Sequence, residues 1–271
     1  MSIKLRKPIV AGTFYSSDKN QLRKDLSSMI VRQKKNKAVI AVLSPHAGYF
    51  YSGECAGKTF GAVKIPDRVI ILGVNHSGIG YSYAIDSNDE WITPLGNVKV
   101  DWELREQLVK KSKIFKIDES SGINEHSIEV QIPFLQYINP NVKILPILIS
   151  GNNYSRIVLG GLELALLIEE NNKKDILIIA STDMSHYISE DLAKVKDGLA
   201  IEKIEALEPE ELLSTVINNK ISMCGVLPVT MTLVAANALK ATQTQIIDYT
   251  NSGVKSGDYN QVVGYLGMTI F

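Results

Sequence analysis

Three of the four histidines in the chain occupy equivalent positions, each a few residues beyond a short apolar run. His46 follows the run AVIAVLS by two residues, His76 follows RVIILGV by two, and His186 follows DILIIAST by four. If those runs are neighbouring parallel strands, the imidazoles gather at the carboxyl edge of one sheet, where ligands bind in open α/β folds. A single histidine after a strand is usually structural, but three at matching positions favour a shared site.

Three further residues could take part in such a site. His126, in GINEHSIEVQ, lies at the expected start of a helix. Cys224, in SMCGV, precedes a helical pattern; a lone cysteine is often inert, but a thiol at a helix N-terminus has a lowered pKa, and a thiolate there could bind a metal. Asp183, in STDMSH, could cap a helix or orient His186 three residues later. The second cysteine, Cys55, is expected to serve only in packing.

The segments that would position these residues alternate between strand and helix patterns. Apolar, β-branched runs typical of strands buried on both faces end at residue 44 and cover 68–74, 142–150 and 175–182. Helical patterns cover 19–32, 102–111 and the segments HSIEVQIPFLQYI, YSRIVLGGLELALLIEE and DLAKVKDGLAIEKIEAL. Near the end of the chain, TQIIDYTNSG and NQVVGYLGMTIF are typical of two antiparallel strands added to the sheet.

This alternation predicts one α/β domain over residues 1–271, in which helices flank a mostly parallel or mixed central sheet in three layers. No repeat, low-complexity tract or linker divides the sequence. The polar, aromatic segment 77–96 is too long for an ordinary connection. We expect it to form a loop or hairpin over the site.

Composition narrows the classes of partner. The chain has 29 basic and 29 acidic residues among its 271, which gives no electrostatic reason to expect nucleic acid or an anionic membrane. No segment is typical of a signal peptide or a membrane span, and two distant cysteines do not form a disulfide framework, so we expect a cytoplasmic protein. A chain of this length needs no structural metal, so a metal would be present for its chemistry.

Seven motifs, in this order and spacing, closely resemble the Memo family, which is also described as the Memo component (protein B) beside AMMECR1-like and radical-SAM proteins. The motifs are RKPIVAGTFY (6–15), SPHAGYFYSG (44–53), LGVNH (72–76), NEHSIEVQIPFLQ (124–136), STDMSHY (181–187), MCG (223–225) and SGDYNQVVGY (256–265). The chain departs from many relatives at Val74, where proline is common, and at Ser16-Ser17, where Pro-Ala is common. The resemblance implies AMMECR1-like and radical-SAM proteins as partners.

The Memo family is similar in fold to the class III extradiol dioxygenases, non-haem iron enzymes that cleave catechol rings. The resemblance therefore implies a single α/β domain with a mixed central sheet. It also implies three metal ligands, namely His46, His76 and Cys224. In the dioxygenases the third ligand is a carboxylate rather than a thiolate.

The resemblance places three more residues in the same pocket. Asp183 and His186 would lie beside the metal, with His186 at the position of the dioxygenase acid/base histidine, and His126 would line the pocket. A soft thiolate ligand favours copper over a hard cation and also suits iron or zinc. Because a thiolate is oxidisable and alters the potential of iron, catechol cleavage is not transferred to this chain.

Three functions agree with these residues. The first is a metal-dependent oxidoreductase that acts on a small molecule or on an oxygen species. The second is a binding or signalling module that uses the same pocket for a peptide, a phosphorylated ligand or a partner protein. The third, which the residues favour least, is a zinc hydrolase with Asp183 or Glu125 as the base.

Overall fold

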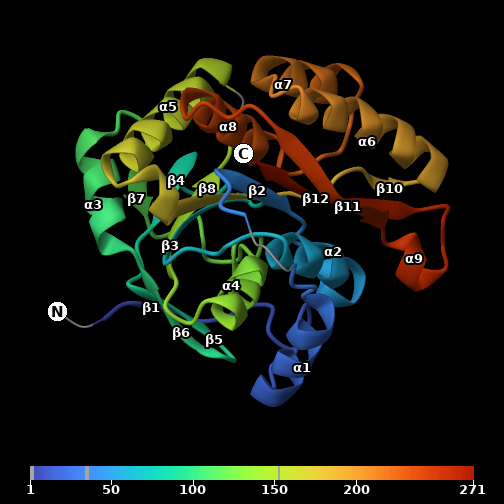
Figure 1. Cartoon of the computed structure of the whole chain (residues 1–271), viewed down its shortest axis with the longest axis horizontal. Helices are drawn as coiled ribbons and strands as arrows, with labels where there is room; N and C mark the ends of the chain where they lie inside the picture. Colours follow the sequence, from blue (N-terminus) through green and yellow to red (C-terminus); the bar gives the residue numbers. More distant parts are fainter. Residues whose placement is uncertain (1–2, 34–36, 152) are drawn as a thin grey trace.

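The chain forms three layers, with a central β-sheet between two sets of helices (Figure 1). The computed structural model describes residues 3–33, 37–151 and 153–271, which form one α/β domain. One set of helices comprises α3 (Trp102–Lys111), α5 (Tyr154–Glu170), α7 (Pro209–Asn218) and α8 (Val226–Ala238). The other set comprises α1 (Lys19–Met29), α2 (Tyr49–Gly61) and α4 (Ile132–Ile138). No helix within the described residues combines the length and apolar character needed to cross a bilayer.

Four parallel strands form the centre of the sheet, in the order β8 (Lys143–Ile149), β3 (Arg68–Val74), β9 (Ile176–Ser181) and β2 (Ala41–Ser44). Beside β2 lies an antiparallel group made of β12 (Val262–Ile270), β11 (Thr244–Asn251) and β10 (His186–Ile188). The other side of β8 carries β6 (Gly96–Val100), β5 (Glu90–Thr93), β1 (Leu5–Arg6), β4 (Tyr83–Asp86) and β7 (Lys116–Asp118). The sheet is therefore mixed with a parallel centre, as predicted.

The remaining elements are short or peripheral. α6 (Glu190–Glu205) packs against α7 and β12, and α9 (Gly253–Ser256) lies in the connection between the two predicted tail strands. Two 3-10 turns, η1 (Glu129–Gln131) and η2 (Lys173–Asp175), precede α4 and β9. The antiparallel pairing of β11 with β12 confirms the prediction made for the end of the sequence.

Alternate residues of the central strands fill two separate hydrophobic cores, one on each face of the sheet. Val69 and Ile71 of β3 pack with α1, α2 and α4, whereas Ile70 and Leu72 pack with α3, α5 and α8. All four side chains are fully buried, because successive residues of a strand point to opposite faces and both faces are covered. The apolar runs in the sequence are explained by this double burial, which also holds the carboxyl edge of the sheet rigidly.

The helix predicted over 19–32 ends earlier, at Met29, where the chain passes close to α2. A Cβ atom on Gly57 would lie 2.4 Å from the backbone oxygen of Met29, and one on Gly61 would lie 2.3 Å from that of Val31. Ile30 is extended, with φ −81° and ψ 106°. The two glycines of α2 let the chain leave α1 and run directly against the helix backbone.

The helix predicted from HSIEVQIPFLQYI also begins later than expected. A 3-10 turn comes before α4, and Pro133 occupies the first turn of α4, where its missing N–H needs no partner. His126 therefore lies in a loop and not at a helix start.

Residues 77–96 were predicted to form a loop or hairpin over the site, and they do contain one strand of a hairpin, because β5 pairs with β6, but this hairpin lies toward the edge of the sheet. They contribute β4 and β5 and lead into β6, and these strands extend the sheet beyond β8. Trp91 of β5 and Val98 of β6 are each only 3% exposed. The predicted position over the site was wrong because EWIT and GNVKV form short alternating strands whose apolar side chains pack on the sheet.

Candidate functional site

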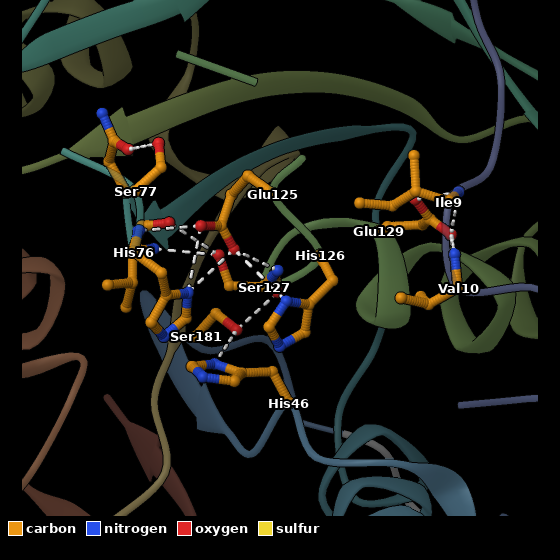
Figure 2. A network of polar contacts seen from close by, with 12 residues as sticks. Ile9, Val10, His46, His76, Ser77, Glu125, His126, Ser127, Glu129 and Ser181 are labelled. Atoms are coloured by element: carbon orange, nitrogen blue, oxygen red, sulfur yellow. Dashed lines mark hydrogen bonds and ion pairs between the residues drawn. The ribbon is translucent and has the colours of Figure 1, made fainter. Parts of the chain in front are cut away.

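Two histidines and a cysteine from three separate segments meet at the carboxyl edge of the sheet. His46 follows β2, His76 follows β3, and Cys224 precedes α8. One possible ligand atom of each residue lies within 4.8 Å of the others, and Cys224 Sγ is 3.2 Å from His46 Nε2. The ring centroids of His46 and His76 are 5.3 Å apart, and Figure 2 shows the two rings close together. The structure thus brings together the three residues predicted as metal ligands, and their role as ligands stays a prediction.

A hydrogen-bond chain behind the ring of His46 assigns its tautomer. Gln131 Nε2 donates to a backbone carbonyl and, at 2.9 Å, to Ser181 Oγ. Ser181 Oγ in turn donates to Ser127 O at 2.6 Å, which uses its only proton. The 3.0 Å contact between Ser181 Oγ and His46 Nδ1 therefore requires a proton on Nδ1. The lone pair of His46 is then on Nε2, the atom that faces Cys224.

Glu125 fixes the orientation of His76 through Nδ1, as Ser181 does for His46. His76 Nδ1 lies 3.0 and 3.1 Å from the two carboxylate oxygens, and the backbone N–H groups of His76 and Ser127 also donate to them. Burial opposes ionisation, but these hydrogen bonds lower the pKa of Glu125 to about 2. The hydrogen bond to this carboxylate raises the pKa of His76. A neutral His76 would carry its proton on Nδ1 and offer Nε2 as a ligand atom.

Cys224 does not have the lowered pKa that its position before a helix predicted. Burial, and then the nearby carboxyl group of Asp183, raise the pKa of this thiol. The backbone N–H of Asp183 lies 3.3 Å from Sγ and favours the thiolate, but burial outweighs this dipole. A cation bound by Cys224 would therefore have to displace the thiol proton.

Asp183 supports His46 instead of capping a helix or contacting His186. Its Oδ1 accepts the backbone N–H of His46 at 2.8 Å, and its Oδ2 lies 3.9 Å from His46 Nε2. Burial raises the pKa of Asp183 to about 6. The predicted orientation of His186 by Asp183 is not seen, because His186 Nδ1 lies 2.9 Å from the carbonyl oxygen of Ser222.

His126 stacks on His76, with ring centroids 5.2 Å apart and ring planes 7° from parallel. The rings of Phe14 and His126 meet in an edge-to-face contact, with centroids 4.9 Å apart. His76, Glu125 and His126 also form a group that could hold an ion. Glu125, however, already accepts the hydrogen bonds that orient His76, so we assign it a supporting role. Burial lowers the pKa of His126, which keeps the ring neutral.

A cavity of about 700 Å³ adjoins the cluster. Its lining includes all four histidines and Asp183, and its aromatic walls are Phe14, Tyr51, Tyr187 and Tyr265. The lining residues that the structure describes include no lysine or arginine.

Because a carbonyl oxygen can only accept, the contact with Ser222 O places a proton on Nδ1 of His186. In neutral His186 the lone pair is on Nε2, which can then take a proton from a ligand.

The donor set fits one transition-metal ion. His46 and His76 each direct Nδ1–H to an oxygen acceptor, as metal-binding histidines almost always do, and in the neutral form of each ring the lone pair is on Nε2. The possible ligand atoms of the three residues lie within 4.8 Å of one another, close enough to share one ion. Two imidazoles and a thiolate suit copper, iron or zinc.

Two residues that support this site were not predicted from the sequence. Ser181 was part of a quoted motif, but only its contact with His46 shows its role. Gln131 is a polar residue in a mostly apolar segment, and it is fully buried. A polar side chain in such a segment is typical of a buried hydrogen-bonding group, and this pattern in the sequence could have identified Gln131.

Fold and site together define a three-layer α/β protein with a cluster of two histidines and a cysteine at the carboxyl edge of its sheet. Residues 6–269 match the family model described as "Memo-like protein". The chain is 42% identical to a "MEMO1 family protein" of Aquifex aeolicus, over 98% of this chain and 99% of that protein. It is 37% identical to one of Methanopyrus kandleri, over 96% of each. The chain therefore belongs to the Memo family.

A solved structure shares the fold at low sequence identity. The crystal structure of an uncharacterized protein from Escherichia coli K12 matches 83% of this chain and 98% of its own, with a TM-score of 0.52 and 13% identity. At this identity the likeness concerns the fold alone. It agrees with the predicted α/β architecture.

Proposed function

We propose that this chain is a metal-dependent redox protein that acts on a small molecule held in the cavity. The observation that carries the proposal is the cluster of possible ligand atoms from His46, His76 and Cys224 within 4.8 Å, with the Nδ1 atoms of both histidines engaged behind the rings. A bound copper or iron ion would supply one-electron chemistry beside the cavity.

The residues around the cluster would prepare the ligand for that chemistry. His186 Nε2 would accept a proton from the ligand and later return it, since Nδ1 is held by Ser222 O. Asp183 would hold the backbone of His46 in place, and its carboxyl group, with a pKa of about 6, could exchange a proton near neutral pH. His126 would keep a neutral ring stacked on His76 and bound the space open to the ligand.

Anaerobic loading with Fe(II) or Cu(I), followed by gel filtration and an oxygen-uptake assay with ascorbate, tests this function. We expect uptake by the loaded parent protein, a similar rate for Cys55→Ala, and a loss of about tenfold or more for His46→Ala. Cys55 is a matched control because it is a buried thiol outside the cluster. Failure to bind either redox metal, or uptake that survives His46→Ala, would contradict the proposal. Zinc-dependent hydrolysis without oxygen would favour the hydrolase instead.

A further inference from the structure

The buried carboxylate of Glu129 is bound by the N-terminal arm, which we define as residues 6–15. Glu129 is 1% exposed. It accepts hydrogen bonds from four groups of the arm: Arg6 Nη1 at 2.8 Å, the N–H groups of Ile9 and Val10 at 3.0 Å, and the Tyr15 hydroxyl at 2.8 Å. Figure 2 shows Ile9 and Val10 directly beside this carboxylate. One side chain thus satisfies donors from both ends of the arm.

The tip of the arm reaches the cavity. Gly12 has φ +90° and its N–H donates to Tyr15 O at 2.7 Å, which closes a tight turn at the tip. Within this turn, Thr13 and Phe14 line the cavity, and the ring of Phe14 meets the ring of His126. The arm therefore supplies part of the cavity wall.

Arg6 joins the base of the arm to the loop that carries His126. Its Nη1 bonds to Glu129, and its Nη2 donates to the carbonyl oxygens of Gly122, at 3.2 Å, and of Glu125. The guanidinium group also lies over the ring of Trp91, 3.9 Å from its centroid. Arg6 is only 8% exposed, so its charge depends on Glu129 for compensation.

We propose that Glu129 is a positioning residue that holds the arm and the His126 loop as one unit, and so sets the ring of His126 and closes the cavity wall. Without the carboxylate, Arg6 would be a buried unpaired cation and the N–H groups of the arm would lose their acceptor. The arm would then separate from the loop, and Phe14 would leave His126. This inference goes beyond the proposed redox function and does not require a bound metal.

The variant Glu129→Gln tests the inference because it keeps the shape of the side chain and removes its charge. In the metal-free protein we expect chymotrypsin to cleave after Phe14 about tenfold faster or more, since cleavage requires local opening. We also expect the imidazole NMR signals of His126 to shift while those of His186, on another wall, stay in place. The double variant Arg6→Met with Glu129→Gln removes the unpaired cation as well and should recover part of the protection.

Two further variants keep the test decisive. Asp101→Asn is the matched control, because Asp101 is also a buried carboxylate, 2.6 Å from Arg68, in a pair that does not involve the arm. It should leave both readouts unchanged. Phe14→Ala, which removes only the contact at the tip, should shift the His126 signals alone even if Glu129→Gln does not fold. Unchanged cleavage in Glu129→Gln, or an equal shift of all four histidines, would overturn the inference.

Discussion

Cys224 Sγ lies 3.2 Å from His46 Nε2, although 178 positions separate the two residues in the chain. The contact links the end of β2 to the segment before α8 and completes a cluster with His76. The lone pair of His46 is on Nε2, the atom that faces Cys224, because Ser181 holds the proton of His46 on Nδ1. The role of residues such as Ser181, which orient the possible ligands, can therefore be tested by substitution, as can the role of the ligands themselves.

Ser181→Ala should weaken metal binding by about 10- to 100-fold, because His46 would lose the acceptor that fixes its tautomer and ring orientation. Affinity can be measured by competition with a chromophoric chelator at pH 7. Ser185→Ala is the control, since Ser185 is also fully buried but lies outside the cluster. Equal affinities for the parent protein and both variants would refute the role of Ser181.

Metal affinity should rise with pH, because binding displaces protons from Cys224 and His76. Both pKa values are raised, so the apo protein still holds these protons at pH values where free side chains would lose them. Below the pKa of His76, metal binding displaces two protons, so affinity should rise by up to about a hundredfold per pH unit. Above the pKa of His76, binding displaces only the proton of Cys224, so affinity should rise about tenfold per pH unit. A chelator competition series from pH 5.5 to 9 measures both slopes. Cys224→Ala should abolish the upper slope, and a flat profile would contradict the assignment.

Gly57→Ala should destabilise the protein by about 1–3 kcal/mol, because the added Cβ would lie 2.4 Å from the backbone oxygen of Met29 and neither backbone can move freely. Gly198→Ala, in α6, is the matched helix control. Nothing lies within 4 Å of its added Cβ, so this change should stabilise by about 0.5–1 kcal/mol. Urea unfolding of the two variants gives the comparison, and effects of the same sign would argue against the close contact between α1 and α2.

The sequence allowed a good prediction of the central strands and of the positions of their histidines. Runs such as RVIILGV are apolar on both faces, and this pattern is local, so the bounds of β3 were correct to the residue. The histidines follow these runs directly, so parallel pairing was enough to bring His46 and His76 together. This part of the site depends only on strand order and direction.

The rest of the site depends on contacts between distant side chains, which local patterns do not encode. Ser181 reaches His46 across 135 positions, and Glu129 reaches Arg6 across 123. The pKa of Cys224 was wrongly predicted because the helix nearby is visible in the sequence, whereas the burial of the sulfur is not. Residues 77–96 were likewise assigned to the site because their pairing with β8 and β1 is invisible locally.

The most direct test of the proposed metal site is the metal content of protein purified without chelator, measured for the parent protein and for His46→Ala, Cys224→Ala and Cys55→Ala. We expect about one copper or iron ion per chain in the parent protein and in Cys55→Ala, and a loss of most of it when His46 or Cys224 is replaced, because each would supply one of three ligands. Equal metal content in all four proteins would contradict the proposed site.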